Sequence, residues 1–350
     1  MPGFELIGTG HYVPGPPITN ADLARVMDTS DEWIYQRSGI KQRHYCPSGM
    51  GVSDLAFEAS KRAIEAAGIS AKEIDYIIFC TMTPDYIFPG SGAILGSRLG
   101  TMAPAMDLRQ QCAAMIFGLQ TIDGLIKTGA AKTILFVGAE AHAGFMPWDD
   151  WSVLEPGSTK RLEGDARARA NEHRALAILF GDGAGAMIFR ATDRDAGLVG
   201  VDLHTDGGAA KMLYVPGGGF RQRPYWNREM FESFAFTPLM DGRELFKYAV
   251  TRLPESARAL LKKTGHSLEQ IDWFLAHQAN QRINEYIRKG LGVPEEKMPM
   301  NIERFGNTSA GTIPILVDEL TRAKKLKKGD LDMVLALGAG IHWGCALVRW

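Results

Sequence analysis

The feature that most restricts the fold of this chain is an internal repeat, in which short apolar strands alternate with amphipathic helices twice along the sequence. The repeated segments are the strands 74–80 and 133–137 with the helices 53–67 and 113–126, then the strands 271–276 and 333–337 with the helices 281–290 and 308–320. Their spacing also agrees, because Asp75 precedes Cys112 by 37 residues and Asp272 precedes Asn307 by 35. An α/β unit used twice predicts two halves related by a pseudo-twofold axis, with Cys112 and Asn307 at equivalent positions.

The join between the two halves is expected near residues 191–197, which divides the chain into residues 1–193 and 194–350. Two stretches interrupt the repeat. Residues 148–173 are polar and helix-prone, and residues 217–238 are rich first in glycine and then in aromatic side chains. They are either surface excursions or caps over a substrate entrance, because long ordered loops often carry function.

Composition and charge exclude several classes of protein. Of the 350 residues, 45% are hydrophobic and 23% are charged, which allows a sizeable core. The 39 Lys and Arg residues balance 40 Asp and Glu residues, so the net charge does not indicate binding to nucleic acid or to a membrane surface. No apolar run reaches the roughly 18 residues of a membrane span, and the first residues lack the basic segment of a signal peptide. We therefore expect a cytoplasmic chain without a membrane segment.

The four cysteines, Cys46, Cys80, Cys112 and Cys345, lie far apart and form no CxxC pair, so neither a zinc site nor a disulfide framework is expected. Cys112 differs from the others because it lies between a strand-like run and an apolar helix, in DLRQQCAAMIFGL. Unpaired N–H groups and the helix dipole at such a position would lower the thiol pKa below its usual value of about 8.5. Cys112 is therefore a candidate nucleophile, with an inert buried cysteine as the alternative.

Two polar residues in the second half are candidates for the same site. His277 ends a strand in FLAHQANQRI, and Asn307 precedes an apolar helix in RFGNTSAGTIPI. Taken singly, His277 fits a hydrogen-bonded core residue and Asn307 fits a helix cap. The repeat predicts that both meet Cys112 where the paired units face each other. The run LGAGIHWG after the last apolar strand could bring backbone N–H groups near the thiol, whereas FGDGAGAMIF leads into a strand and lacks the context of a dinucleotide site.

Together these residues resemble the β-ketoacyl-acyl carrier protein synthase III family, which has the thiolase-like fold. The resemblance extends over nearly the whole chain and rests on TSDEWIYQRSGIKQRH, HRALAILFGDGAGA, HQANQRI, FGNTSAGTIP and GAGIHWGCALVRW. It implies a five-layered αβαβα homodimer. It also implies a ping-pong reaction in which an acyl-CoA loads the enzyme and the acyl group then condenses with malonyl-acyl carrier protein as carbon dioxide leaves. No metal or redox cofactor is implied.

The resemblance also implies the roles of single residues. Cys112 matches the acylated nucleophile, and His277 and Asn307 match the pair that donates hydrogen bonds to the malonyl thioester oxygen. The backbone N–H groups of Cys112 and Ala339 match the oxyanion hole for the acyl group. Such donors stabilise negative charge as it develops on oxygen.

Binding roles follow from the same resemblance. Trp33, Arg37 and Arg174 match the coenzyme A site, where Trp33 and Arg174 stack on adenine. The residues that match the acyl pocket are Phe88, Phe180, Gln111 and Met115, and Phe88 is expected to reach across a dimer interface into the partner's pocket. The residues that match the basic docking surface for the carrier protein are Lys247, Arg282, Arg288 and Lys289.

The chain departs from the family pattern around the nucleophile, where Gln110, Gln111 and Met115 replace more usual residues, and near the pantetheine channel, where Arg243 does so. Glutamine can bind a polar substituent and methionine adapts to irregular ligands. We therefore predict a starter longer or more functionalised than acetyl. The alternatives are a non-decarboxylating acyltransferase, a secondary-metabolite starter-unit enzyme of the same family and a non-catalytic partner subunit.

Overall fold

The computed structural model describes residues 2–350, and its first half builds a five-stranded sheet. The strands are β1 (Gly3–Tyr12), β4 (Tyr76–Cys80), β5 (Ala105–Leu108), β6 (Thr133–Glu140) and β7 (Gly183–Thr192), in the order β1-β7-β6-β4-β5. Strand β4 pairs in parallel with β5 and β6, and β7 is antiparallel to β6 and β1. Side chains along β6 are buried on both faces, as its continuous apolar sequence requires.

The second half builds a four-stranded sheet with the same order. Its strands are β8 (Gly197–Thr205), β11 (Phe274–Ala276), β12 (Leu331–Gly338) and β13 (His342–Arg349), in the order β11-β12-β13-β8. Here β11 pairs in parallel with β12, and β13 is antiparallel to β12 and β8. The chain passes from one sheet to the other between β7 and β8, at residues 193–196.

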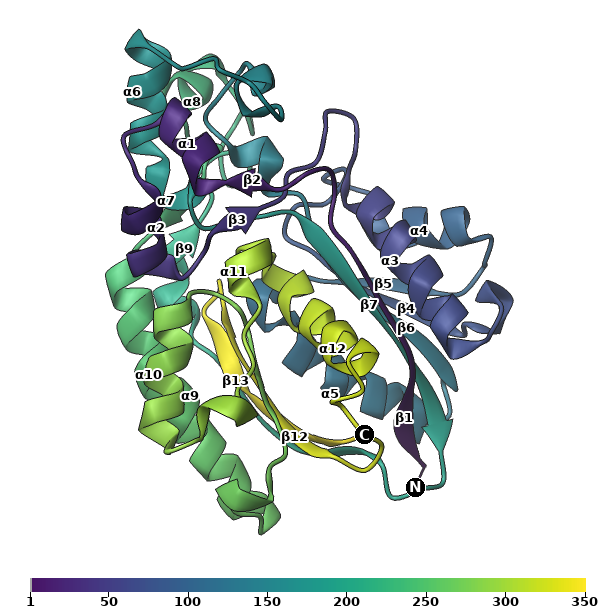
Figure 1. Ribbon diagram of the computed structural model, residues 1–350. Coiled ribbons are helices and arrows are strands. Elements are labelled where there is room, and N and C mark those ends of the chain that lie inside the picture. Colours follow the sequence, from purple (N-terminus) through teal and green to yellow (C-terminus); the bar gives the residue numbers. More distant parts are fainter. Residues whose placement is uncertain (1) are drawn as a thin grey trace.

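Helices separate and cover the two sheets in five layers, as Figure 1 shows. The helices α5 (Ala114–Lys127) and α12 (Thr312–Arg322) lie between the sheets. The outer layers are α3 (Val52–Ala67) and α4 (Ser91–Leu99) on the first sheet, and α9 (Gly242–Thr264) and α10 (Gln281–Leu291) on the second. The predicted thiolase-like αβαβα fold is confirmed.

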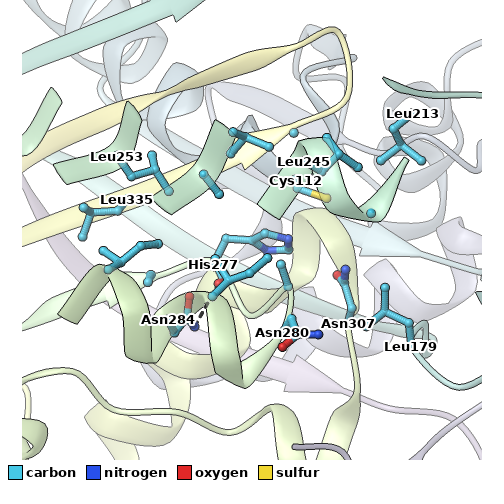
Figure 2. Close-up of a pocket in the computed structure, with 18 of the residues that line it drawn as sticks. Cys112, Leu179, Leu213, Leu245, Leu253, His277, Asn280, Asn284, Asn307 and Leu335 are labelled. Carbon is cyan, nitrogen blue, oxygen red and sulfur yellow. Dashed lines mark hydrogen bonds between the residues drawn. The ribbon is translucent and has the colours of Figure 1, made fainter. Parts of the chain in front are cut away.

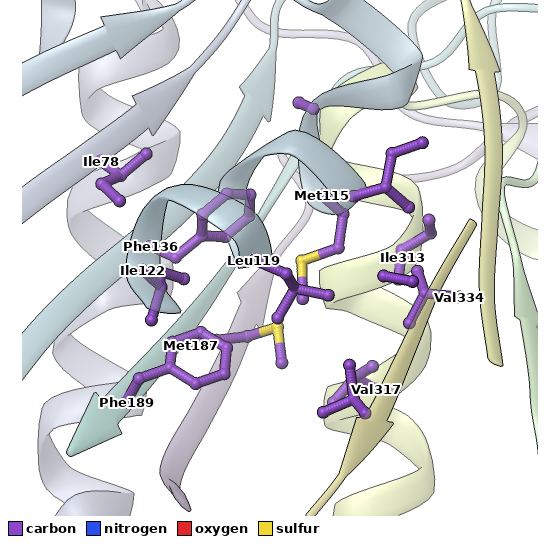
Figure 3. Close-up of a cluster of buried hydrophobic side chains, with 14 of the residues drawn as sticks. Ile78, Met115, Leu119, Ile122, Phe136, Met187, Phe189, Ile313, Val317 and Val334 are labelled. Carbon is purple, nitrogen blue, oxygen red and sulfur yellow. The ribbon is translucent and has the colours of Figure 1, made fainter. Parts of the chain in front are cut away.

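The central helices are buried because apolar side chains surround them. The main core cluster runs from the first sheet through α5 and α12 to the second sheet, and Figure 3 shows Leu119, Phe136, Val317 and Val334 within it. A helix that is apolar on all sides is stable only where it is covered on all sides. The sandwich between two sheets supplies that cover.

One prediction about the repeat is wrong. A 3₁₀ turn precedes each central helix, and it begins at Gln111 before α5 and at Ser309 before α12. Both first residues have positive φ, 46° and 48° respectively. Since each turn begins three residues before its helix, the equivalent of Cys112 is Ala310, and Asn307 lies outside the turn. The backbone of Asn307 instead bonds to Leu179 and Gly181, which holds it as a short strand-like bridge.

Most of the remaining helices and strands form a cluster at one end of the layers (Figure 1). They are α1 (Asn20–Val26), α2 (Asp31–Ser38), α6 (Gly164–Glu172), α7 (Arg174–Ala177), α8 (Arg228–Glu232) and the short strands β2 (Ile18–Thr19), β3 (Gln42–Arg43), β9 (Leu213–Tyr214) and β10 (Leu239–Met240). The two stretches that interrupt the repeat meet here, because His173 packs against Phe234 with ring centroids 5.2 Å apart. No helix in residues 2–350 has the length and apolar content to cross a membrane.

Candidate active site

Cys112, His277 and Asn307 line one cavity of about 140 Å³ (Figure 2). Cys112 lies in the 3₁₀ turn before α5, His277 directly follows β11, and Asn307 lies between α11 (Ile302–Phe305) and α12. All three side chains are buried. The fold therefore brings together the three residues that the sequence singled out, from three separate segments of the chain.

The surroundings of Cys112 keep its thiol protonated. Burial raises the pKa of Cys112 to about 12, so the expectation of a lowered pKa at the helix terminus is wrong. Desolvation of the thiolate outweighs the effect of Ser309 Oγ, 3.3 Å from Cys112 Sγ, whose hydroxyl lowers the pKa because it can donate a hydrogen bond to the thiolate. The other three cysteines are also buried and free.

The end of β12 passes close to the nucleophile. A Cβ atom on Gly338 would lie 3.0 Å from the Cys112 backbone nitrogen and 2.8 Å from that of Ala113, so only glycine fits there without a shift. Ala339 is the next residue along the chain. This close approach explains why residue 338 is a glycine. It also brings the segment that contains Ala339 next to the 3₁₀ turn that contains Cys112.

His277 is a neutral imidazole in this site. Burial lowers its pKa to about 3. Its Nδ1 lies 2.7 Å from Thr312 Oγ1, its backbone N–H donates to the Leu335 carbonyl at 2.8 Å, and its carbonyl accepts from Asn284 Nδ2 at 3.2 Å (Figure 2). The Thr312 hydroxyl also lies 3.0 Å from the Ser309 carbonyl, to which it can donate. In the tautomer in which this hydroxyl donates to Nδ1 instead, the ring proton is on Nε2 and can be donated to a ligand.

The Asn307 amide has a fixed orientation. Its Oδ1 accepts a hydrogen bond from the Ser309 backbone N–H at 2.8 Å. Because a backbone N–H can bond only to the amide oxygen, Nδ2 is left as a donor for the cavity that Asn307 lines. Neutral donors of this kind, held in place before a ligand binds, suit an oxygen atom that gains negative charge during a reaction.

Sequence reasoning missed a buried carboxyl group near the thiol. Glu140 ends β6 and accepts hydrogen bonds from Thr81 Oγ1 at 3.1 Å, Thr83 Oγ1 at 2.7 Å and the Met82 backbone N–H at 3.0 Å. Burial raises its pKa to about 7, although these hydrogen bonds act to lower it. The signal in the sequence was an acidic residue at the end of the continuous apolar strand TILFVGAE.

Comparison with known proteins agrees with this geometry. The models "3-Oxoacyl-[acyl-carrier-protein (ACP)] synthase III" and its C-terminal counterpart match residues 106–207 and 261–350, and "Thiolase, N-terminal domain" matches residues 36–144. The β-ketoacyl-[acyl-carrier-protein] synthase III of Xanthomonas euvesicatoria pv. vesicatoria is 37% identical over 99% of this chain and 98% of its own. The chain belongs to the synthase III family.

Two further members support this assignment. Synthase III 1 of Bacillus anthracis is 38% identical over 99% of this chain and 98% of its own. The crystal structure of the Aquifex aeolicus synthase III superposes with a TM-score of 0.85 at 33% identity, over 99% of this chain and all of that one. The chain is therefore a condensing enzyme of the acyltransferase type.

The predicted coenzyme A residues of this synthase III family member lie together. The guanidinium carbon of Arg37 is 4.1 Å from the centroid of the Trp33 ring, and that of Arg174 is 4.4 Å from it. Trp33 and Arg37 belong to α2, whereas Arg174 begins α7, and its Nη1 donates to the Asp28 carbonyl. The Trp33 indole and the neighbouring guanidinium groups offer planar surfaces on which a nucleobase can stack.

The residues predicted for the acyl pocket lie in different places, and the role of Phe88 in a partner's pocket stays a prediction. Of the four residues only Phe180 lines the cavity, where its ring stacks on His142 with centroids 4.6 Å apart. Met115, the second residue of α5, packs into the central core instead, beside Ile313 of α12 (Figure 3). Gln111 is half-buried outside the cavity lining, and Phe88 is 80% exposed.

Apolar side chains from α9, α10 and β12 line the cavity instead. They are Leu245, Ala249, Leu253, Ile283, Ile287, Leu335 and Leu337. The helical spacing of the residues on α9 and α10 is present in the sequence, but it is also the spacing of an ordinary core-facing helix. Only the position of these helices beside Cys112 distinguishes a cavity wall from a packed core.

The predicted docking residues lie on α9 and α10, the two helices that also line the cavity. Arg282 and Lys289 are exposed. Lys247 pairs with Glu244 at 2.5 Å, and Arg288 is half-buried and donates to the Val293 carbonyl at 3.2 Å. Arg282 and Lys289 are therefore the more available charges. Arg243, near the start of α9, is exposed as well.

Proposed function

We propose that this chain condenses an acyl-CoA starter with malonyl-acyl carrier protein, with loss of carbon dioxide, to give a 3-oxoacyl-acyl carrier protein. The observation that carries the proposal is the meeting of the Cys112 thiol, the neutral His277 imidazole and the fixed Asn307 amide in one apolar cavity. The reaction is ping-pong, because the acyl group is bound to Cys112 after coenzyme A leaves and before the malonyl-acyl carrier protein reacts.

In the loading step Cys112 Sγ attacks the thioester carbon of the acyl-CoA, and coenzyme A leaves. The backbone N–H groups of Cys112 and Ala339 stabilise the oxyanion that forms on the carbonyl oxygen. The close approach of Gly338 to the Cys112 turn supports this assignment, since it brings the Ala339 segment to the reacting group. Trp33, Arg37 and Arg174 hold the adenine end of coenzyme A.

In the condensation step the malonyl thioester loses carbon dioxide, and its carbonyl oxygen becomes an enolate. His277 and Asn307 donate hydrogen bonds to that oxygen. The lowered pKa of His277 supports a donor role and argues against an acidic one, because the imidazole is neutral at physiological pH. The enolate carbon attacks the acyl group, and Cys112 is released as the leaving thiolate.

The partners in this proposal are the acyl-CoA, the malonyl-acyl carrier protein and a second copy of the chain. The acidic carrier protein docks on α9 and α10, where Lys247, Arg282, Arg288 and Lys289 lie. The second copy binds at the exposed segment that contains Phe88. The reaction needs neither a metal nor a redox cofactor, because decarboxylation itself generates the carbon nucleophile.

The test is to weigh the protein after incubation with acyl-CoA, then weigh the products after malonyl-acyl carrier protein is added. We expect one acyl group per chain, lost in the second step as a 3-oxoacyl product appears. Cys112→Ala should form no acyl-enzyme, and acylation of that variant would place the nucleophile elsewhere, with Cys80 the next candidate. Transfer of the acyl group to an alcohol or amine without loss of carbon dioxide would instead identify a non-decarboxylating acyltransferase.

A further inference from the structure

Three asparagine side chains line the active-site cavity, and they differ in which amide atoms are already bonded. Asn280 is bonded at both ends, because its Nδ2 donates to the Arg37 carbonyl and its Oδ1 accepts from the Arg282 backbone N–H, each at 2.9 Å. Asn307 is bonded through Oδ1, which leaves its Nδ2 as a donor. Asn284 has the opposite arrangement, since it is bonded through Nδ2.

The backbone of His277 fixes the orientation of the Asn284 amide. Asn284 Nδ2 lies 3.2 Å from the His277 carbonyl oxygen, which can accept a hydrogen bond only from the amide nitrogen (Figure 2). In residues 2–350 no group donates a hydrogen bond to Oδ1, and this atom is not enclosed by protein atoms. Oδ1 is therefore an acceptor that faces the cavity.

Asn284 is a polar residue on the otherwise apolar buried face of α10. It is 1% exposed, and the residues about one and two turns further along that face, Ile287 and Leu291, are buried as well. A buried amide costs free energy unless its polar atoms are paired. Buried acceptors are normally satisfied by the protein, by water or by a ligand. Since the protein supplies no partner to Oδ1, the partner comes from what fills the cavity.

Resting on the proposed function, we propose that Asn284 selects the starter, and that its Oδ1 accepts a hydrogen bond from a hydroxyl group on the acyl chain. The preferred starter is then a hydroxyacyl-CoA. Oδ1 needs a donor, and a keto or ether oxygen on the chain cannot supply one. Neither Asp nor Glu is among the described residues that line the cavity, so a charged ammonium group would be buried without a partner at a high cost. A hydroxyl group is a neutral donor.

The place of Asn284 in the cavity separates this role from the chemical step. In the view of Figure 2, Asn284 lies on the same side of His277 as Leu253 and Leu335, and Asn307 lies on the other side. Asn284 is bonded to the backbone of His277 and not to its ring, whereas the ring acts on the thioester oxygen in the proposed reaction. We therefore expect the hydroxyl group along the chain, away from the reacting carbonyl.

The selection works through the cost of an unpaired acceptor. An unsubstituted chain that excludes water from Oδ1 leaves this atom without a hydrogen bond, whereas a hydroxyl group at the right carbon restores the bond. A buried acceptor left without its partner lowers binding enough for a preference of about tenfold to a hundredfold.

The experiment lets octanoyl-CoA compete with octanoyl-CoAs that carry one hydroxyl group at successive carbons. The readout is the mass of the acyl-enzyme formed on Cys112 of the wild-type protein. We expect at least one hydroxylated isomer to react about tenfold faster than octanoyl-CoA. Asn284→Leu should abolish this preference, because leucine has a similar branched shape and no acceptor.

Ile287→Ala is the matched control. It changes the apolar wall about one turn further along α10 and leaves the amide of Asn284 in place. The ratio of the two acylation rates should then be retained, even where both rates change. An equal loss of rate for both substrates in Asn284→Leu, with the ratio unchanged, would mean that Asn284 only holds the backbone of His277, and it would overturn the proposal.

The wild-type protein also decides the matter by itself. If no hydroxylated isomer reacts faster than octanoyl-CoA, the proposal is wrong, whether or not Asn284→Leu folds. Failure of the proposed function is a separate outcome, because it would appear as the absence of an acyl-enzyme with every acyl-CoA in the series.

Discussion

At the scale of single residues, burial sets the charge state of the site. It raises the pKa of Cys112 to about 12 and lowers that of His277 to about 3, so the thiol and the imidazole are both neutral at pH 7. Because the imidazole and the Asn307 amide are neutral, no paired ion has to leave before they donate hydrogen bonds to a ligand. The site is therefore prepared for an oxygen that becomes negative only during the reaction.

We predict that His277→Ala and Asn307→Ala still load an acyl group but lose most of the condensation step. Removal of one fixed oxyanion donor costs about 3 kcal/mol, or at least about a hundredfold in rate. The two steps are measured separately, as acyl-enzyme mass and as carbon dioxide released from malonyl-acyl carrier protein. Normal condensation in both variants would remove these residues from the enolate site, and slow loading would point to a structural defect.

At the scale of elements, α2 supplies a test of the coenzyme A site that contains its own control. Trp33→Ala should raise the KM for acyl-CoA by about tenfold, because stacking on a base is worth about 1–3 kcal/mol. The KM for malonyl-acyl carrier protein should stay nearly constant. Tyr35→Ala, which removes an exposed aromatic ring from the same helix, should change neither constant. An equal rise for both substrates in Trp33→Ala would contradict the assignment.

The prediction of a starter longer than acetyl rests on the apolar faces of α9 and α10. Because leucine and isoleucine side chains of these helices line the cavity of Cys112, acyl-CoAs of six to ten carbons should outcompete acetyl-CoA. Each buried methylene contributes about 0.8 kcal/mol, which is several-fold per carbon. Ala249→Leu, which narrows the cavity, should shift the preference toward shorter chains. If acetyl is preferred at equal concentration, the apolar lining serves another part of the substrates.

At the scale of the whole molecule, an exposed apolar segment lies beside the edge of the first sheet. Tyr86, Ile87 and Phe88 are largely exposed, and Met102, just before the edge strand β5, is 99% exposed. Apolar side chains gathered next to an unpaired strand edge commonly mark a protein interface. This placement supports the proposed homodimer.

We predict that Met102→Glu weakens or abolishes the dimer, because a buried, unpaired carboxylate would disfavour the interface. Analytical ultracentrifugation over a range of concentrations measures the effect. Phe220→Glu, a charge placed on an exposed aromatic residue of a different segment, should leave the dimer intact. A monomeric wild-type protein, or a dimer unaffected by the change at Met102, would rule out this surface.

The architecture of the molecule followed from local patterns in the sequence. The continuous apolar run at residues 133–137 lies within β6, and the periodic run at residues 53–67 is α3 but for one residue. The repeat predicted the two layered halves, and it placed Cys112 and His277 near strand ends that meet. These features depend on neighbours only a few residues away, so a linear sequence contains them.

Only the tertiary structure decided the finer properties of the site. The pKa of Cys112 depends on how many distant segments exclude water from it, and helix-terminus reasoning alone gave the wrong direction. The direction of Met115 was equally hidden, because both sides of α5 are apolar and either could have faced a ligand. The contact of Ser309 with Cys112 joins residues 197 positions apart in the chain. Desolvation and long-range contact arise from the packing of whole layers, and no local periodicity encodes them.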